Sequence, residues 1–250
     1  MPDTPARNKA TIPVVVALVA ALITGVMLLG PALAGDSGES NDTAGTPPVS
    51  DVSRDGSRPP ANPEDDPFAK LVRRDPEDPT ALGEVDAPVV MINYSEFQCP
   101  FCGKFARDTE PELVKKYVED GTLRIEWRDF PYLGPESTTA AQAGRAAAEQ
   151  GKFWEFHDAM FANQQPPNSG KVTEDYLVGV AEQVGLDIEK FREDLGSKWA
   201  AEAVEKDFEQ GQQIGITGTP AFLVNSRPIM GAQPTEVFVE TIEQAAEEAE

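Results

Sequence analysis

The sequence predicts one α/β domain, a mixed β-sheet with helices on both faces, which follows an apolar segment and a proline-rich linker. Three observations support this prediction. The composition changes twice within the first 86 residues. After that point, strand patterns alternate with helix patterns, which indicates a crossover between parallel strands. The last two strand patterns are separated only by a turn, so the sheet ends in a hairpin and is mixed.

The N-terminal segment is predicted to cross a membrane. Residues 1–10 are polar and basic, whereas residues 11–34 contain no charged side chain. The apolar run 12–29 is long enough for a helix of about 27 Å, close to the ~30 Å hydrocarbon thickness of a bilayer. Basic residues before such a run keep the N-terminus in the cytoplasm. We expect a single-pass signal anchor; small residues ending at Ala34 leave a cleaved signal peptide and a secreted protein as the alternative.

Residues 35–86 are predicted to form a disordered linker. They contain eight prolines, 13 acidic residues and five basic residues, and few large apolar residues. Such a segment cannot bury enough apolar surface to offset the entropy lost on ordering. Only residues 68–72 have the composition of a docked turn. The linker is therefore expected to hold the domain away from the membrane.

Residues 87–250 form the predicted folded domain. Residues 87–94 are almost continuously apolar, as in a strand covered on both faces, and 123–130 alternate as in a half-buried strand. The remaining patterns predict helices at 101–117, 137–161, 171–199 (one or two) and 235–250, and short strands at 221–225 and 228–230. The helical block between the second and third strands, about 137–205, is predicted to be an insert in the sheet topology.

Charge and composition exclude several classes of function. The chain carries 21 basic and 43 acidic residues, a net charge of −22, and has no basic cluster for a nucleic-acid backbone. It contains one histidine and two cysteines, too few for a four-cysteine zinc or iron–sulfur site within one chain. We expect no nucleic-acid partner, no metal and no organic cofactor.

The chemistry is predicted to lie at Cys99-Pro100-Phe101-Cys102. These residues follow a buried strand and open a helix, where the helix N-terminus stabilises a thiolate at Cys99. Pro100 is tolerated at this position because its missing N–H would be unpaired in any case. Cys102 lies one turn further along and can attack a mixed disulfide formed at Cys99. This placement favours redox chemistry.

Two other interpretations of the cysteines remain open. A structural disulfide would close a very short loop and would therefore add little stability. Half of a metal site shared with a second chain is the other possibility. Near the C-terminus, Pro220 opens a predicted strand, where a proline is compatible with the sheet and an X-Pro bond can be cis.

Together these residues resemble a known family. The segments Glu96–Cys102 and Gly218–Phe222 are similar to the two signature loops of DsbA-family thiol-disulfide oxidoreductases, and Gly151–Asp158 is similar to that family's helical insert. The resemblance covers about residues 88–245. It implies a thioredoxin-like fold with an inserted helical domain, and a cis Thr219–Pro220 bond facing Cys99. The backbone at Thr219 would then pair with an extended substrate strand.

Two positions depart from the family pattern. Phe101 stands where strongly oxidising members have histidine, so the Cys99 thiolate lacks one source of stabilisation. Asn93 stands where many members have a buried acid, and its amide cannot ionise. Glu96 is a candidate for that proton relay, with a solvated loop carboxylate as the alternative. His157, in an aromatic helix, is expected to be a packed or surface side chain.

We therefore predict a thiol-disulfide oxidoreductase outside the cytoplasm that forms or exchanges disulfides in exported proteins through Cys99 and Cys102. Its expected partners are cysteine-containing exported proteins and a membrane or small-molecule redox partner. We expect a monomer, because no dimerisation element can be identified. The alternatives are a membrane-tethered reductase or isomerase of the same fold, and a binding or chaperone module with a static disulfide.

Overall fold

The computed structural model describes residues 68–249, which belong to one compact unit. The predicted apolar segment 11–34 and most of the predicted linker lie outside the described residues. Within residues 68–249, none of the helices combines the length and the hydrophobicity needed to span a bilayer.

The centre of the unit is a five-stranded mixed sheet with strand order β1-β3-β2-β4-β5. Strands β2 and β3 are parallel, and the other three pairs are antiparallel. This confirms the predicted crossover followed by a hairpin. The strands are β1 (Ala81–Leu82), β2 (Val89–Ser95), β3 (Leu123–Asp129), β4 (Ala221–Val224) and β5 (Arg227–Met230).

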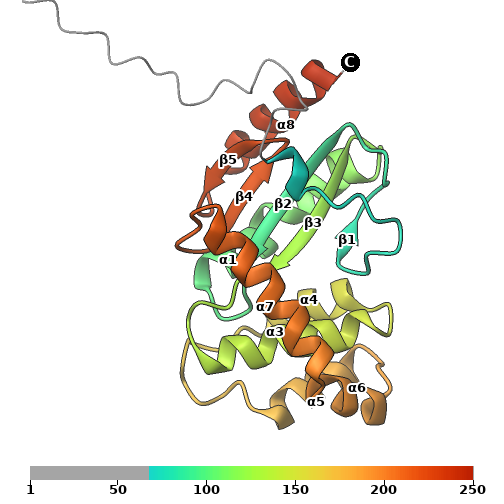
Figure 1. The fold of residues 1–250 in the computed structure, drawn as a ribbon, viewed down its shortest axis with the longest axis vertical. Helices are drawn as coiled ribbons and strands as arrows, with labels where there is room; N and C mark the ends of the chain where they lie inside the picture. The colour runs from blue at the N-terminus through green and yellow to red at the C-terminus, as the bar shows by residue number, and fades with distance from the viewer. Residues whose placement is uncertain (1–67, 250) are drawn as a thin grey trace, which may run out of the picture. The chain divides into compact units, whose positions relative to one another are not determined.

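Helices cover both faces of the sheet (Figure 1). On one face, Phe105 of α1 (Pro100–Asp108) and Phe238 of α8 (Thr235–Ala249) pack with Phe222 of β4. After α1 the chain continues as α2 (Glu110–Leu113) and a π-helical turn (Val114–Val118). The opposite face, which includes Tyr94 and Phe130, packs against Phe208 of α7 (Lys198–Gln213).

The helical insert lies between β3 and β4 in sequence and is gathered at one end of the sheet, at the opposite end from α8 (Figure 1). It consists of α3 (Pro135–Ala148), α4 (Phe153–Ala162), α5 (Glu174–Gln183) and α6 (Ile188–Leu195), with α7 returning the chain to the sheet. The insert therefore extends beyond the predicted end near residue 205. Its aromatic core includes Phe97 and Trp127 from the sheet side, so the two parts share one core cluster.

The end of the predicted linker is ordered, which corrects the expected boundary at residue 86. A 3₁₀ turn forms at Ala69–Leu71, as the composition of residues 68–72 predicts, and β1 pairs with β3. The backbone N–H groups of Arg73 and Arg74 donate to the Glu126 carboxylate at 3.0 and 2.9 Å. The segment is ordered because its backbone N–H groups bind a buried carboxylate. Its low content of apolar residues gives no indication of this contact.

Strand β3 is buried along its whole length, whereas its alternating pattern predicts a half-buried strand. The polar face is covered, and its charges pair with one another: Arg128 contacts Glu126 at 2.6 Å, and Arg145 of α3 contacts Asp129 at 2.6 Å. Asp207 of α7 also contacts Arg145. The polar positions of β3 therefore form an internal ion network instead of a solvated face.

Candidate redox site

The two cysteines lie where β2 gives way to α1. Cys99 is the N-cap residue of α1, and Pro100 occupies the first turn. The Cys99 sulfur accepts a hydrogen bond from the backbone N–H of Cys102 at 3.4 Å. Both side chains are free thiols, and their exposed fractions are 2% and 1%. The cap position therefore gives Cys99 a hydrogen-bond donor that stabilises its thiolate.

The loop before β4 meets the cysteines from the other side. The Thr219–Pro220 bond is cis, as the resemblance implies. The Cys99 sulfur lies 3.3 Å from the Thr219 carbonyl oxygen, across 120 positions of sequence, and donates a hydrogen bond to it when the thiol is protonated. Sheet topology explains the meeting: β2 and β4 are antiparallel neighbours with Tyr94 opposite Ala221, so the end of β2 and the start of β4 share one edge.

The two thiols differ in acidity. The hydrogen bond from the Cys102 thiol is the largest cause that lowers the pKa of Cys99. Together with contacts to Thr219 and to the backbone at 101–102, and against the effect of burial, it brings this pKa to about 6. Burial raises the pKa of Cys102 well above its ordinary value, and the charge of Cys99 adds to this rise. At neutral pH the pair therefore holds one thiolate, at Cys99, and one thiol.

Two buried polar side chains lie just before the cysteines. Glu96 is 2% exposed, and neither of its carboxyl oxygens has a hydrogen-bond partner among residues 68–249. Burial raises the pKa of Glu96 to about 8, and the nearby Cys99 charge contributes to this rise. Asn93 is also buried, and its Oδ1 has no partner within the described part of the chain. The expectation of a solvated Glu96 carboxylate is therefore wrong.

The known proteins that this chain resembles agree with this geometry. A family model described as thioredoxin matches residues 75–244. A Bacillus cereus protein named "Probable disulfide bond formation protein D" is 34% identical over 149 residues, covering 58% of this chain and 69% of that protein. The crystal structure of oxidised BdbD from Bacillus subtilis matches with a TM-score of 0.63 and 28% identity, covering 67% of this chain and 92% of that one. The chain belongs to the DsbA family of thiol-disulfide oxidoreductases.

The same domain matches part of a different kind of protein. A Na⁺/H⁺ antiporter, NhaA 1 of Salinispora arenicola, is 32% identical over 177 residues, which cover 70% of this chain. The chain spans about a quarter of that antiporter's length (26%).

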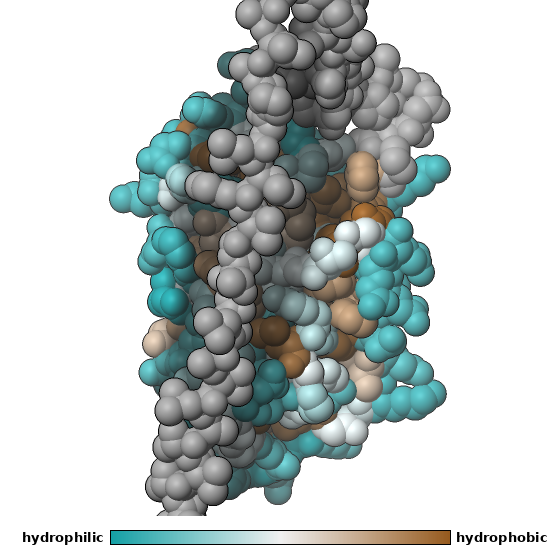
Figure 2. Space-filling view, turned by 90° about the vertical axis from the view of Figure 1, so that its left-hand side faces the viewer, coloured by the Kyte–Doolittle hydropathy of each residue, from teal (hydrophilic) through white to brown (hydrophobic). Residues whose placement is uncertain are grey.

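Exposed apolar side chains mark the surface of this DsbA-family site. Phe101, between the cysteines, is 63% exposed, and Met230 of β5, which pairs with Ala221, is 51% exposed. Tyr132 is also exposed; partial burial raises its pKa, and the charge of Cys99 raises it further, so its ring lies near the thiol. Figure 2 shows apolar side chains gathered along the middle of one face, between hydrophilic margins.

Two residues of the site could not be predicted from sequence patterns. Tyr132 follows β3 and belongs to neither signature loop. Gln164 follows α4, and its side-chain amide donates to the carbonyls of Phe97 and Cys99 at 3.0 and 2.9 Å. Neither residue lies at a characteristic spacing from the cysteines along the chain. Both come near them only in the folded domain.

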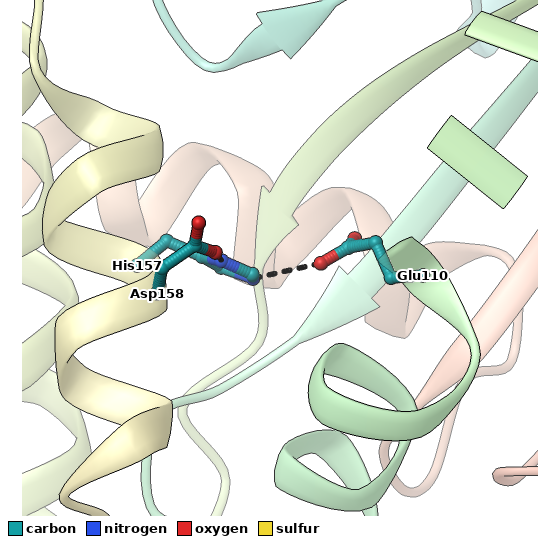
Figure 3. A group of neighbouring side chains, drawn as sticks. All are labelled: Glu110, His157 and Asp158. Atoms are coloured by element: carbon teal, nitrogen blue, oxygen red, sulfur yellow. Dashed lines mark hydrogen bonds and ion pairs between the residues drawn. The ribbon is translucent and has the colours of Figure 1, made fainter. Parts of the chain in front are cut away.

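His157 of α4 is packed, as expected, and is 1% exposed (Figure 3). Its Nε2 lies 3.5 Å from Glu110 and its Nδ1 lies 2.9 Å from Asp158. Burial raises the pKa of Glu110 to about 7. The three side chains are close enough to be considered for a cation. However, the two carboxylates meet opposite nitrogens of the ring, so one ion bound at either nitrogen faces only one of them.

Proposed function

We propose that this protein is a thiol-disulfide oxidoreductase that forms or exchanges disulfides in exported proteins. The observation that carries the proposal is the pair of thiols at the start of α1, in which the Cys99 sulfur caps the helix beside the Thr219 carbonyl and Cys102 donates its backbone N–H to that sulfur. A low-pKa outer thiol and a high-pKa inner thiol suit exchange at the outer sulfur. Pro100 and Phe101 complete the active-site loop, and Thr219 and Pro220 form the facing loop.

The proposed oxidation transfers two electrons. A substrate thiolate attacks the Cys99 sulfur of the Cys99–Cys102 disulfide, forming a mixed disulfide and releasing Cys102 as a thiolate that takes up a proton. A second substrate thiolate then attacks the substrate sulfur of the mixed disulfide and releases the Cys99 thiolate. The substrate gains a disulfide, and the enzyme is left as a dithiol. A membrane or small-molecule oxidant accepts the two electrons, so the reaction needs no metal or organic cofactor.

Glu96 is proposed as the proton relay of this cycle. Its buried carboxyl group is sensitive to the charge on Cys99. When the Cys99 thiolate is converted to a disulfide, that charge disappears and the acidity of Glu96 increases. On reduction, the Glu96 carboxyl group gives its proton to the Cys102 thiolate and is reprotonated from solvent. On oxidation, the proton passes from Cys102 through Glu96 to solvent. Asn93, which cannot ionise, is not part of this relay.

We also propose that the domain works outside the cytoplasm. The uncharged run 11–34, after a basic N-terminus, supports a single-pass anchor, and cleavage near Ala34 would give a secreted protein instead. Disulfides persist in such compartments, which suits dithiol oxidation. The proposed partners are exported proteins with cysteines and a redox partner in the membrane or among small molecules. The proposed active form is a monomer.

The test is the equilibrium of the Cys99–Cys102 pair with glutathione, measured on the purified protein. We expect a midpoint between thioredoxin's ~−270 mV and the ~−120 mV of the strongest oxidant, because Phe101 lacks the histidine's charge. Exchange with a dithiol peptide should be lost in Cys99→Ser, whose folding should be unchanged. A midpoint at or below about −270 mV would instead indicate a reductase. If glutathione cannot reduce the Cys99–Cys102 disulfide, and Cys99→Ser keeps a binding or chaperone function, the disulfide is a static bridge.

A further inference from the structure

A side chain of the helical insert is fastened to the redox loop. Gln164, which lies just after α4, donates through its Nε2 to the carbonyl of Phe97 at 3.0 Å and to that of Cys99 at 2.9 Å. The Cys99 carbonyl also accepts from the backbone N–H of Gly103 at 3.1 Å. A primary amide has two N–H donors, so each hydrogen serves one carbonyl. One side chain therefore holds the backbone on both sides of residue 98.

The other end of the amide explains a glycine inside α1. A β-carbon at Gly103 would lie 2.2 Å from Oε1 and 2.8 Å from Cδ of Gln164, closer than any real contact. Glycine within a helix is less favourable than alanine by about 0.5–1 kcal/mol. Its presence here leaves the space that the Gln164 side chain occupies. The arrangement thus depends on two residues, one in the insert and one in the helix that carries the cysteines.

An arginine secures the same junction. Arg107 of α1 donates to the Phe161 carbonyl at 2.7 Å, and its Nη1 lies 3.5 Å from the Oε1 of Gln164. The end of α4 is thereby attached to α1 one turn beyond Gly103. The position of the Gln164 amide relative to the redox loop is therefore set from both sides.

We propose that Gln164 is the positioning residue for the redox cysteine. By holding the carbonyls of Phe97 and Cys99, it keeps the Cys99 sulfur at the helix cap and in line for attack by Cys102. This role rests on the proposed exchange function. It assigns the insert a part in the chemistry: the insert determines how the loop is held when a substrate sulfur is attached to Cys99.

The consequence is greatest in the resolving step. In a mixed disulfide with glutathione, the Cys102 thiolate attacks the Cys99 sulfur, a Cys99–Cys102 bond forms, and glutathione leaves as a thiolate. Attack needs a fixed geometry, and small displacements of reacting atoms slow such steps strongly. Loss of the amide removes both hydrogen bonds. It should slow release of glutathione about tenfold or more, because one net hydrogen bond already corresponds to a change of up to about tenfold.

The experiment compares Gln164→Ala with Gln165→Ala, a matched control. Gln165 is the adjacent glutamine, and its amide donates to the carbonyl of Asn163 within its own loop at 2.8 Å. Each purified variant is loaded with glutathione at Cys99, and the release rate is measured together with the pH midpoint of Cys99 alkylation by iodoacetamide. Gln164→Ala should slow release and raise the midpoint, whereas Gln165→Ala should match the unmodified protein in both.

Gly103→Ala provides a second route to the same result, because its β-carbon would lie 2.2 Å from the Gln164 Oε1 and displaces the amide. It would also lie 2.7 Å from Arg107 Nη1, the end of a flexible side chain. It should slow release as Gln164→Ala does, and adding it to Gln164→Ala should have a smaller effect than Gly103→Ala has on the unmodified protein. A purely structural role predicts lower thermal stability with unchanged release rate and midpoint in the folded fraction, and that result would overturn the inference.

The same measurements separate the inference from the proposed function. If the unmodified protein alkylates with the midpoint of an ordinary thiol and does not release glutathione, the exchange function is wrong. If it releases glutathione rapidly and Gln164→Ala does so equally fast, only the role of Gln164 is wrong.

Discussion

Two sets of buried polar side chains in this protein differ in how they are partnered. On β3 and the helices that cover it, charges pair with charges, Glu126 with Arg128 and Asp129 with Arg145, although the Nε of Arg128 has no hydrogen-bond partner among residues 68–249. Beside the cysteines, polar atoms are left without partners among residues 68–249. These atoms are the two carboxyl oxygens of Glu96, Oδ1 of Asn93 and Oγ1 of Thr219.

The difference appears in the acidity of the two glutamates. Burial raises the pKa of both, but at Glu126 the Arg73 N–H and the Arg128 charge outweigh it and lower the pKa below its ordinary value. At Glu96 burial prevails and the pKa is raised to about 8. Paired buried charges stabilise one arrangement of the chain, whereas an unpaired buried acid can exchange a proton near neutral pH. Burial alone therefore does not mark a functional carboxyl group.

The largest expected effect comes from breaking the paired set. Arg145→Met leaves Asp129 and Asp207 buried with less compensating charge, and should lower the free energy of unfolding by about 3–5 kcal/mol. Urea denaturation measures this. Lys104→Met, which breaks the exposed Lys104–Asp108 pair, is the control and should cost less than about 1 kcal/mol. An Arg145 variant as stable as the control would show that the network contributes little.

The second prediction concerns the thiolate. The pKa of Cys99 is about 6 in the folded protein and ordinary when unfolded, so between pH 6 and pH 9 the unfolded state binds more protons. The reduced protein should therefore gain stability relative to Cys99→Ser by up to about 1.4 kcal/mol per pH unit over this range, and lose it as the pH falls through 6. Urea unfolding in a reducing buffer at several pH values measures the difference. A constant difference would contradict the low pKa of Cys99.

Glu96→Gln should have an effect of similar size and opposite sign. Because the pKa of Glu96 is raised to about 8, the folded state keeps a proton that the unfolded state releases between pH 4.5 and pH 8. Stability from this group is complete at low pH and is lost as the pH rises through 8. The variant should match the unmodified protein near pH 4 and exceed it near pH 8 by up to about 4 kcal/mol.

Glu119→Gln, at an exposed position, is the control for this series and should leave the pH dependence of unfolding unchanged. The relay itself is tested by proton release on oxidation of the reduced protein with a disulfide reagent, recorded in weak buffer. Glu96→Gln should release less than the unmodified protein, and equal release would exclude the relay.

The smallest expected change is Phe101→His. Phe101 is 63% exposed, so folding should be unaffected. A histidine beside Cys99 adds a hydrogen-bond donor and positive charge that stabilise the thiolate, and should raise the reduction potential by about 30 mV, a tenfold change in the equilibrium with glutathione. Phe101→Ala separates the gain of histidine from the loss of the ring, and should not raise the potential.

Elements whose determining contacts are local can be predicted from the sequence. The helix start at Pro100 and the hairpin at β4 and β5 depend on neighbouring residues, and both were predicted. The alternating pattern of β3 predicts a solvated face, but this face is covered in the structure. The order of residues 73–86 could not be predicted either, because it depends on Glu126, about 50 positions away.

The chemistry can be predicted from the amino-acid sequence, because two cysteines at a helix start and a proline at a strand start are local features with known chemical consequences. The surroundings of that chemistry depend on the folded domain. Folding left Glu96 unpaired, paired Glu126 with arginines, and brought Gln164 from the insert onto the loop of Cys99. Acidity and positioning depend on which groups are brought together and on how far water is excluded. The number of residues between two side chains along the chain gives neither their contacts nor their access to water. Acidity and positioning are therefore set only when the whole domain has folded.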